Sequence, residues 1–469
     1  MKIKKTKKSW GKIRLIGISI FILAGLNSNS YAETITVGSG GQYSSIQEAI
    51  NASSPGDTVR VDPGTYTENV NVNKSDIRLI SSSTTRPVIV GRIDSSNRNN
   101  NLIDGFEVRN WTGISHGITI SYGQNLTVRN CVIHDGSGVG SDSGIYSRNS
   151  TNVNIENNEI YNCVKGVNIA SGHSSNGDYS GGVKIFGNEI HDCPVDGIDI
   201  HGEYFTISDN LIYDNINTNI TQTHPDGIQF IASIVDGYTS VQHARVFNNI
   251  IRNHSQNIFT EGTESEENSN CRDVHIYNNV VYNTAGVVNG VIMDELTNSN
   301  LVIKYSKDIH IYNNTLGRAG NNAIYIHHCA SESIYLKNNI INNNLRNGIY
   351  VQDPADVAPG AMDFNLFHNY DIDIAWGAAR LALENFQNSY PAYSPNSISA
   401  DPLVNLYPTP YLKEGSPGIN SGIQLDDLYR FDKDGHVREE NNWDIGVFEF
   451  YPDLEYVPPS APTLELLAP

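Results

Sequence analysis

Short segments in which apolar and polar residues alternate recur along most of the chain, in pairs and in a constant order. The first segment of each pair usually opens with a glycine and a β-branched residue, and the second ends in asparagine. Alternation with a period of two residues predicts β-strands and not helices. The first segments open at Gly117, Gly144, Gly166, Gly197, Gly227, Asn257, Gly290, Ala323 and Gly348. The second segments end at Asn158, Asn188, Asn210, Asn249, Asn279, Asn314 and Asn339.

The spacing of this repeat predicts a solenoid. Asn188 and Asn210 are 22 residues apart, and Asn210 and Asn249 are 39 apart, which is the range of solenoid repeats. One repeat cannot bury its inner face alone, so neighbouring repeats must stack. We therefore expect an all-β protein that is a single-stranded right-handed parallel β-helix of about 9–11 coils. The recurring asparagines are expected to hydrogen-bond to one another along the stack, which is a structural role.

The two ends of the repeat differ from its middle. Residues 44–51 place Ile46 and Ile50 on one face of a short helical pattern, which predicts a helix that caps the solenoid. We expect the β-helix to span residues 33–375 and a C-terminal capping segment to span residues 376–451. Residues 452–469 are rich in proline and are expected to form a disordered tail.

Residues 1–32 have the composition of a signal peptide. Seven Lys or Arg precede an apolar segment at residues 15–26, and small residues surround a cleavage site after Ala32. The apolar segment is shorter than the roughly 20 residues needed to cross a membrane. We expect a bacterial protein that is secreted or periplasmic and that has no membrane contact after cleavage.

The charge of the mature chain limits its partners. Beyond residue 32 the chain has 24 basic and 51 acidic residues, a formal charge of −27. A nucleic-acid partner is not expected, because it would require a basic surface. The cysteines show no metal-binding spacing, although Cys163 and Cys193 lie in equivalent turns and could stack or form a disulfide.

The outward positions of the glycine-led strands hold the candidate chemistry. Adjacent coils lie about 4.8 Å apart, so equivalent outward residues of successive strands should form columns. An ordinary solenoid surface would carry Thr, Ser, Asn and Lys at these positions. Here one patch instead gathers Asp196, Asp199, His201 and Asp226, with Lys165 one coil before them and His224 in the turn before Asp226.

The same columns continue along the solenoid and could contact a polymer. Extra residues follow several glycine-led strands, so the loops should stack into a wall beside the sheet and form a long cleft. Tyr146 and Tyr325 would offer flat faces to sugar rings. The other candidate substrate-binding residues are Arg148, Gln229, Glu261, Asp294 and His327.

A metal-assisted reaction fits this patch. Asp196, Asp199 and Asp226 could bind Ca²⁺, which prefers carboxylate oxygens, and the ion would neutralise the carboxylate of a uronate. The C5 proton of that sugar would then be removed by a base, and β-elimination or epimerisation would follow. The candidate bases are His201, His224 and Lys165.

Hydrolysis is the alternative reaction. Asp196 or Asp199 could work with Glu261 as the acid and base of an inverting glycoside hydrolase, which requires carboxyl groups about 6.5–9.5 Å apart. A third possibility is a surface or adhesion β-helix without catalysis.

Three segments resemble known families. Residues 46–66, which contain IQEAI and PGDTVRVDPGTY, are similar to secreted carbohydrate-active β-helix proteins, and residues 398–450 resemble the C-terminal cap motif of such bacterial proteins. Residues 195–201, VDGIDIH, resemble the Asp-Gly-Phe-Asp calcium strand of a pectate lyase family, which implies calcium ligands at Asp196 and Asp199. Gln229 stands where those enzymes carry a catalytic lysine.

The string VDGIDIH is also similar to the Tyr-Gly-Phe-Asp-Pro-His strand of mannuronan C5-epimerases. This resemblance implies catalytic roles for Asp199 and His201, whereas Asp196 replaces the tyrosine. We therefore expect a secreted monomeric Ca²⁺-dependent polysaccharide lyase that cleaves a uronate-containing polymer. A C5-epimerase, an inverting hydrolase and a non-catalytic adhesion protein remain alternatives.

Overall fold

The computed structural model describes most of the chain beyond the predicted signal peptide. The described residues are 32–113, 116–136, 138, 140, 142–170, 180–216, 225–232, 240–262, 270–288, 291–292, 299–343, 346–404 and 409–452. The predicted signal peptide before Ala32 and residues 453–469 of the predicted tail lie outside this set.

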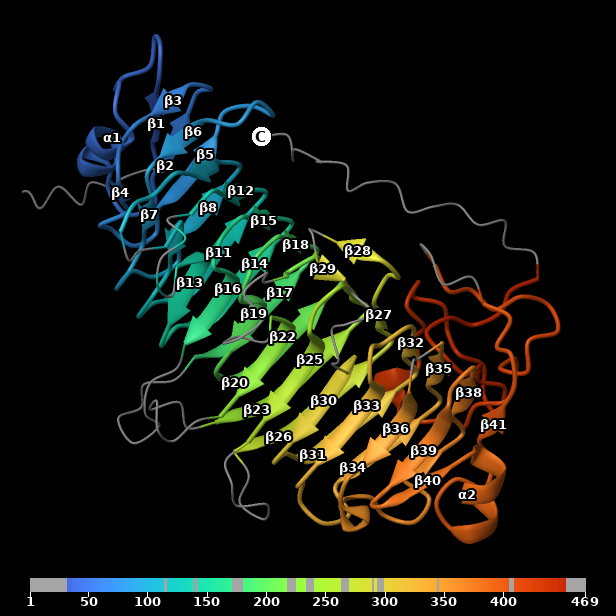
Figure 1. Ribbon diagram of the computed structural model, residues 1–469. Coiled ribbons are helices and arrows are strands. Elements are labelled where there is room, and N and C mark those ends of the chain that lie inside the picture. The colour runs from blue at the N-terminus through green and yellow to red at the C-terminus, as the bar shows by residue number, and fades with distance from the viewer. Residues whose placement is uncertain are drawn as a thin grey trace, which may run out of the picture. The chain divides into compact units, whose positions relative to one another are not determined.

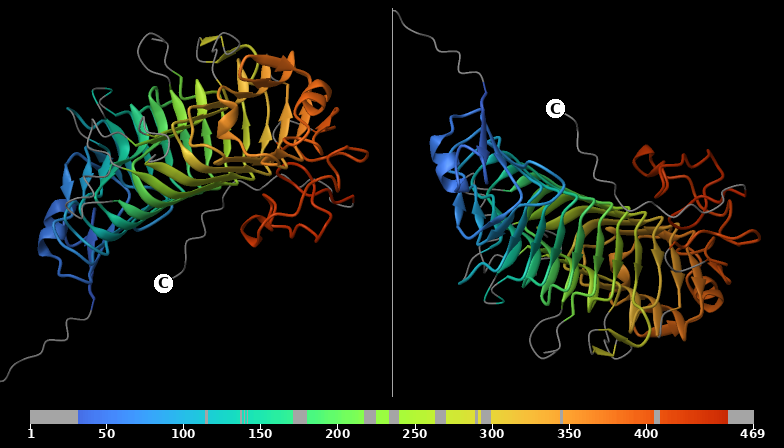
Figure 2. Two further views of the ribbon diagram at one scale, coloured as in Figure 1. Left: turned by 90° about the horizontal axis from the view of Figure 1, so that it is seen from below. Right: turned by 90° about the horizontal axis from the view of Figure 1, so that it is seen from above.

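Three long sheets of stacked strands form a right-handed parallel β-helix, as the repeat predicts (Figure 1). Within the described residues each sheet has 13 strands, and consecutive strands of the chain pass from one sheet to the next. The strands of successive coils lie side by side along the solenoid in both views of Figure 2. Neighbours within these three sheets are parallel, except that β40 (Ala379–Leu381) runs antiparallel to β39 (Ile372–Trp376).

We name the sheets A, B and C. Sheet A comprises β1 (Thr34–Val37), β2 (Thr58–Val61), β5 (Arg78–Ser81), β8 (Leu102–Asp104), β11 (Gln124–Arg129), β14 (Thr151–Glu156), β17 (Gly181–Phe186), β20 (Gly202–Ser208), β23 (Val241–Phe247), β26 (Cys271–Tyr277), β31 (Lys307–Tyr312), β34 (Ile334–Lys337) and β37 (Met362–Asp363). Sheet B comprises β3 (Thr65–Tyr66), β6 (Val88–Val90), β9 (Glu107–Arg109), β12 (Val132–His134), β15 (Glu159–Tyr161), β18 (Glu189–His191), β21 (Leu211–Tyr213), β24 (Ile250–Arg252), β27 (Val280–Tyr282), β32 (Thr315–Leu316), β35 (Ile340–Asn342), β38 (Leu366–His368) and β41 (Ile398–Ser399).

Sheet C contains the glycine-led strands. It comprises β4 (Val70–Asn71), β7 (Ile93–Asp94), β10 (Ile118–Thr119), β13 (Ser143–Arg148), β16 (Lys165–Ala170), β19 (Asp196–Ile200), β22 (Asp226–Ile231), β25 (Gln256–Glu261), β30 (Leu301–Lys304), β33 (Asn322–His327), β36 (Asn347–Val351), β39 (Ile372–Trp376) and β40 (Ala379–Leu381). The helical segments are α1 (Ile46–Ala52), α2 (Leu383–Ser389), η3 (Pro354–Asp356) and η4 (Asp427–Tyr429).

Columns of aliphatic side chains fill the interior of the solenoid. In sheet C one buried column runs through Ile118, Ile145, Val167, Ile198, Ile228 and Ile258. A glycine precedes each of these residues except Ile258, which follows Asn257, and the glycine is needed because the backbone of the next coil lies close. A Cβ on Gly197 would stand 2.6 Å from the carbonyl oxygen of Gly227. The N-terminal end is covered by α1, which buries Ile46 and Ile50 as predicted.

The asparagines form a continuous buried ladder. Each side-chain amide donates to the Oδ1 of the equivalent asparagine in the next coil, at 2.9–3.0 Å. The asparagine ladder comprises Asn158, Asn188, Asn210, Asn249, Asn279, Asn314, Asn339 and Asn365, one residue more than the repeat predicted. Each amide also donates to the backbone, as Asn249 does to the Ile207 carbonyl at 2.9 Å, which confirms the structural role.

One predicted strand is wrong. The segment that opens at Gly290 was expected to continue sheet C, but Val291–Ile292 (β29) instead pairs antiparallel with Val287–Val288 (β28). The sheet C strand of this coil is β30, which pairs with β25 and lacks a leading glycine. Leu301 and Ile303 fill the core positions of that coil. Asp294, a predicted substrate-binding residue, lies outside the described residues.

The segment that follows the last coils folds back along the solenoid. The Asn278 side chain donates to the Phe431 carbonyl at 2.7 Å, and Lys433 donates to the Asn248 carbonyl. Within this segment the buried Arg438 pairs with Glu449. The five cysteines are buried and none forms a disulfide, so Cys163 and Cys193 are not bridged.

Candidate functional site

Lys165, Asp196 and Asp199 meet on the outer face of sheet C. Strand register places Asp196 beside Lys165, and Asp199 lies one outward position further along the same pair of strands. The Lys165 ammonium lies 3.0 Å from Asp196 Oδ2 and also contacts Asp199 Oδ2. Both carboxylates are buried, whereas 18% of the lysine side chain is exposed. One cation, with a path to solvent, is therefore held between two anions.

His201 approaches Asp199 from the end of β19. Its Nδ1 lies 2.6 Å from the Ile231 carbonyl, so this nitrogen carries a hydrogen and donates it. Its Nε2 lies 3.3 Å from Asp199 Oδ1. That oxygen is buried and accepts no hydrogen bond from the described residues. The Asp199 carboxylate is therefore close enough to stabilise a positive charge on the His201 ring.

Asp226 completes the group one coil further on. It stands beside Asp196 in the strand register, and its backbone amide donates to Asp196 Oδ1 at 3.4 Å. Gln229, beside Asp199 in the register, donates from Nε2 to Asp226 Oδ2 at 2.9 Å. We name the set Lys165, Asp196, Asp199, His201, Asp226 and Gln229 the Lys165 cluster. His224, the other predicted base, lies outside the described residues.

The protonation states of the Lys165 cluster follow from these contacts. Burial raises the pKa of Asp196 to about 6, against the opposing effect of Lys165. Burial alone would raise the pKa of Asp199, but His201 and Lys165 hold it below its ordinary value. Burial alone would lower the pKa of Lys165, but Asp199 and Asp196 raise it above its ordinary value. Lys165 therefore stays protonated and does not serve as a base.

The predicted calcium ligands do not fit calcium well. The Lys165 ammonium already pairs with both Asp196 and Asp199, and Asp226 accepts a hydrogen bond from Gln229. In the part of the chain that the structure describes, no three His, Cys, Asp or Glu side chains are placed to bind one metal ion together. A hard cation would have to displace the lysine. Calcium binding stays a prediction, and we derive no step from it.

The predicted hydrolase pair is poorly placed. Glu261 lies two coils beyond Asp199 and two residues further along its strand, so their Cα atoms are about 12 Å apart. Lys304, in the coil beyond Glu261, forms an ion pair with it and holds it away from Asp199. Lys304 was missed in the sequence because its strand lacks the leading glycine.

Two predicted residues lie on the N-terminal side of the Lys165 cluster. Tyr146 is two positions before Asp199 in its column, with Asn168 between them. Its ring stacks on His116 with 4.1 Å between centroids, and burial lowers the pKa of His116 to about 4. Arg148 ends β13 and is exposed.

Two more predicted residues, Tyr325 and His327, lie together on the C-terminal side of the cluster. Their rings stack at 5.5 Å, and the Tyr325 ring also stacks at 5.1 Å on Tyr350. Beyond them a hollow of 320 Å³ is lined by Tyr350, Arg346 and Arg380 among others. The arginines were not predicted, because Arg346 precedes its glycine-led strand and Arg380 lies in β40, an antiparallel strand outside the repeat.

The comparison with family models agrees with the fold. The model of the family described as "right handed beta helix region" matches residues 67–235. A search of curated proteins gives no match. Pectate lyase Pel9A is 14% identical with a TM-score of 0.45, over 90% of this chain and 97% of its own.

Other solved structures are similar to the same degree. The mannuronan C-5 epimerase AlgE4 A-module of Azotobacter vinelandii is 16% identical with a TM-score of 0.39, over 76% of this chain and 94% of its own. PfbA, a surface adhesin of Streptococcus pneumoniae, is 14% identical with a TM-score of 0.42, over 70% of this chain and 87% of its own. Among the described residues no helix is both long enough and apolar enough to cross a bilayer.

Proposed function

We propose that the Lys165 cluster is the active site of an enzyme that acts on a uronate-containing polysaccharide. The enzyme removes the C5 proton, which is adjacent to the carboxylate, and cleaves the chain by β-elimination. One observation carries the proposal: a buried Asp199 contacts the Lys165 ammonium through one oxygen and faces His201 Nε2 through the other. A cation and a basic nitrogen are thus fixed on either side of one carboxylate.

Lys165 provides the charge that binds the substrate. Its side chain is partly exposed and its ammonium stays protonated, so it pairs with the uronate carboxylate. Neutralising that carboxylate makes the adjacent C5–H bond more acidic. In the sequence analysis, calcium was expected to neutralise the uronate carboxylate. Here Lys165, which Asp196 and Asp199 hold in place, has that role.

His201 accepts the C5 proton. In the neutral ring Nδ1 donates to the Ile231 carbonyl, so the lone pair is on Nε2. The Asp199 carboxylate, 3.3 Å from Nε2, stabilises the imidazolium that forms. The electrons of the C5–H bond form the C4–C5 double bond, and the C4–O bond breaks.

Asp196 is our candidate for the acid that protonates the departing oxygen. Its pKa of about 6 lets it carry a proton in mildly acidic solution. The second candidate function is C5 epimerisation, in which a proton returns to the opposite face of C5 and no bond to C4 breaks. The position of Asp196 favours epimerisation. Asp196 contacts Lys165 from the first residue of β19, whereas His201 faces Asp199 from just beyond the last residue of that strand.

A screen of polymers tests the proposal. Alginate, polygalacturonate and a neutral glucan are each incubated with the protein, and the products are read for unsaturated ends, reducing ends and C5 configuration. Unsaturated ends from a uronate polymer support the lyase, and a changed C5 configuration without cleavage supports the epimerase. Reducing ends without unsaturation, or no change in any uronate polymer, would contradict the proposal.

A further inference from the structure

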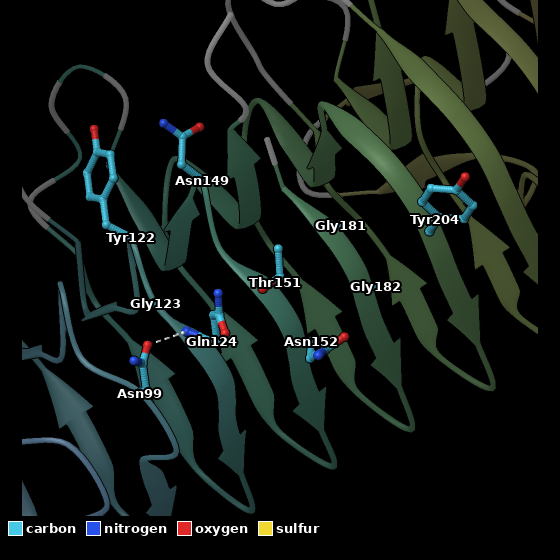
Figure 3. A pocket seen from close by; sticks show the side chains of 10 residues that line it. All are labelled: Asn99, Tyr122, Gly123, Gln124, Asn149, Thr151, Asn152, Gly181, Gly182 and Tyr204. Carbon is cyan, nitrogen blue, oxygen red and sulfur yellow. Dashed lines mark hydrogen bonds between the residues drawn. The ribbon is translucent and has the colours of Figure 1, made fainter. Parts of the chain in front are cut away.

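A second hollow lies away from the Lys165 cluster, at the corner where the chain passes from sheet C to sheet A (Figure 3). Its volume is 790 Å³, and it extends over four coils from β11 to β20. Tyr122 and Tyr204, at its two ends, are 47% and 57% exposed. We name this feature the amide hollow.

A column of amides leads into the amide hollow and then stops. On the outer side of this corner, Asn100 donates to Asp76 at 2.7 Å, Asn125 to Asn100 at 2.8 Å, and Asn152 to Asn125 at 3.2 Å. These residues have positive φ, which asparagine tolerates. The next residue in the column is Gly182, which has no side chain to continue the ladder.

Gly182 leaves a gap that is one coil wide. A Cβ at this position would stand 2.8 Å from Asn152 Oδ1, so that acceptor faces the gap. Gly181 also lines the hollow and leaves the backbone bare beside it. Figure 3 shows the Asn152 side chain and the Tyr204 ring on opposite sides of Gly182.

Tyr204 forms the far wall of the gap. One face of its ring stacks on His243, with 4.7 Å between centroids and 18° between planes. Because the two rings stack along the solenoid axis, the other face is turned toward the coil of Gly182. Its φ of +60° is unusual for a bulky residue, and most residues with this conformation here are Asn or Asp.

We infer that the amide hollow binds an uncharged oligosaccharide. A sugar ring stacks on the free face of Tyr204, and its hydroxyl groups bond to Asn152 Oδ1 and to the amides on the same wall, including Gln124. From β11 to β20 the site is about 14 Å long, enough for more than one sugar. Among the described residues that line it, none is charged, so a uronate finds no cation there.

This site is separate from the proposed catalytic one. Tyr204 lies three residues after His201, but it belongs to the corner and not to the outer face of sheet C. The Lys165 cluster is charged and takes an anion, whereas the amide hollow takes a neutral ligand. Binding there does not depend on whether the Lys165 cluster is catalytic.

The missing side chain suggests the decisive variant. Gly182→Asn restores the amide column and fills the gap, and its φ of +65° suits asparagine. The nearest atom to the new Cβ is the end of the flexible Asn152 side chain, which can move. The variant should therefore fold as the wild type does. Tyr204→Ala removes the stacking wall instead.

Binding of xylohexaose, cellohexaose and mannohexaose to the full chain is measured by isothermal titration calorimetry. We expect at least one to bind, and Gly182→Asn and Tyr204→Ala each to weaken it at least about tenfold. Phe431→Ala, which removes another exposed aromatic ring, and Asp199→Asn should leave it unchanged. The inference is overturned if none of the three binds, if both hollow variants bind as the wild type does, or if Asp199→Asn abolishes binding.

Discussion

The asparagine ladder and the Lys165 cluster are both columns of buried polar side chains that run across successive coils. In the ladder every coil contributes the same residue, and each amide donates to the next coil at 2.9–3.0 Å. In the Lys165 cluster each coil contributes a different residue: a lysine, two aspartates with a histidine, and an aspartate with a glutamine. The ladder satisfies its polar groups, whereas Asp199 Oδ1 has no hydrogen bond from the described residues.

The difference separates structure from chemistry. A repeated side chain that bonds to its own copy stabilises the stack and is saturated. A column that departs from the repeat buries charged side chains, which lowers the stability of the fold. Proteins retain such destabilising groups mainly at sites where a function requires them. The amide hollow obeys the same rule, because it opens where Gly182 interrupts a column of amides.

The largest effect is expected in the Lys165 cluster. Asp199→Asn removes the charge that holds Lys165 and stabilises a protonated His201, while its shape is kept. Activity on a uronate polymer should fall at least about 10³-fold, or about 4 kcal/mol of transition-state stabilisation. Initial rates and a thermal melt check this. Activity within tenfold of the wild type would show that the cluster is not the active site.

The ladder should show the opposite response. Asn249→Ala leaves the amide of Asn210 without its acceptor and the Ile207 carbonyl without a donor. The free energy of unfolding should fall by roughly 3–5 kcal/mol, with the activity of the folded protein unchanged. Urea unfolding measures the change, and the exposed Asn73→Ala serves as the matched control. A loss of activity in the folded variant would remove the distinction between the two columns.

Stability should depend on pH through Asp196. Its pKa is raised from 3.8 to about 6, so between these values the folded state binds more protons than the unfolded state. Its contribution to stability is therefore lost as the pH rises from about 4 to about 6. Asp196→Asn should remove this loss and stabilise the protein at neutral pH by roughly 1–3 kcal/mol.

Unfolding by urea at the two ends of this pH range measures the effect of Asp196→Asn. Asp76→Asn, at an exposed carboxylate, is the control and should leave the pH dependence unchanged. An Asp196→Asn variant that still loses the same stability between pH 4 and 6 would assign the titration to another group.

The smallest effect is expected from a chelator. Because Lys165 already occupies the space between Asp196 and Asp199, excess EDTA should leave activity on the uronate polymer unchanged. Rates before and after dialysis against EDTA, with and without added calcium, measure this. Loss of activity that calcium restores would show that a metal displaces Lys165, as the sequence predicts.

Much of this arrangement could be predicted because a solenoid turns sequence spacing into spatial position. The repeat alone places Lys165, Asp196 and Asp226 in one column, and the strand register confirms it. The side-chain contacts inside the column could not be predicted, because they depend on side-chain conformation. From the sequence alone, Asp196 and Asp199 could bind either a calcium ion or the Lys165 ammonium.

Two features were hidden for other reasons. Lys304 sits in a strand without the leading glycine, after a long insertion, so the pattern favoured the segment at Gly290 instead. The amide hollow depends on what Gly182 lacks, and one glycine among 40 carries no signal of its own. The gap at Gly182 can be recognised only in the structure, where Asn152 and Tyr204 of the neighbouring coils lie on either side of it.

Hydrogen exchange at C5 tests the central claim most directly, because elimination and epimerisation share that step. The wild type and Asp199→Asn are incubated with alginate and with polygalacturonate in D2O, with EDTA present, and the products are examined by NMR. We predict that the wild type gives unsaturated ends or deuterium at C5 with one polymer and that Asp199→Asn gives neither. No change at C5 with either polymer, or an equal change with both proteins, would contradict the account.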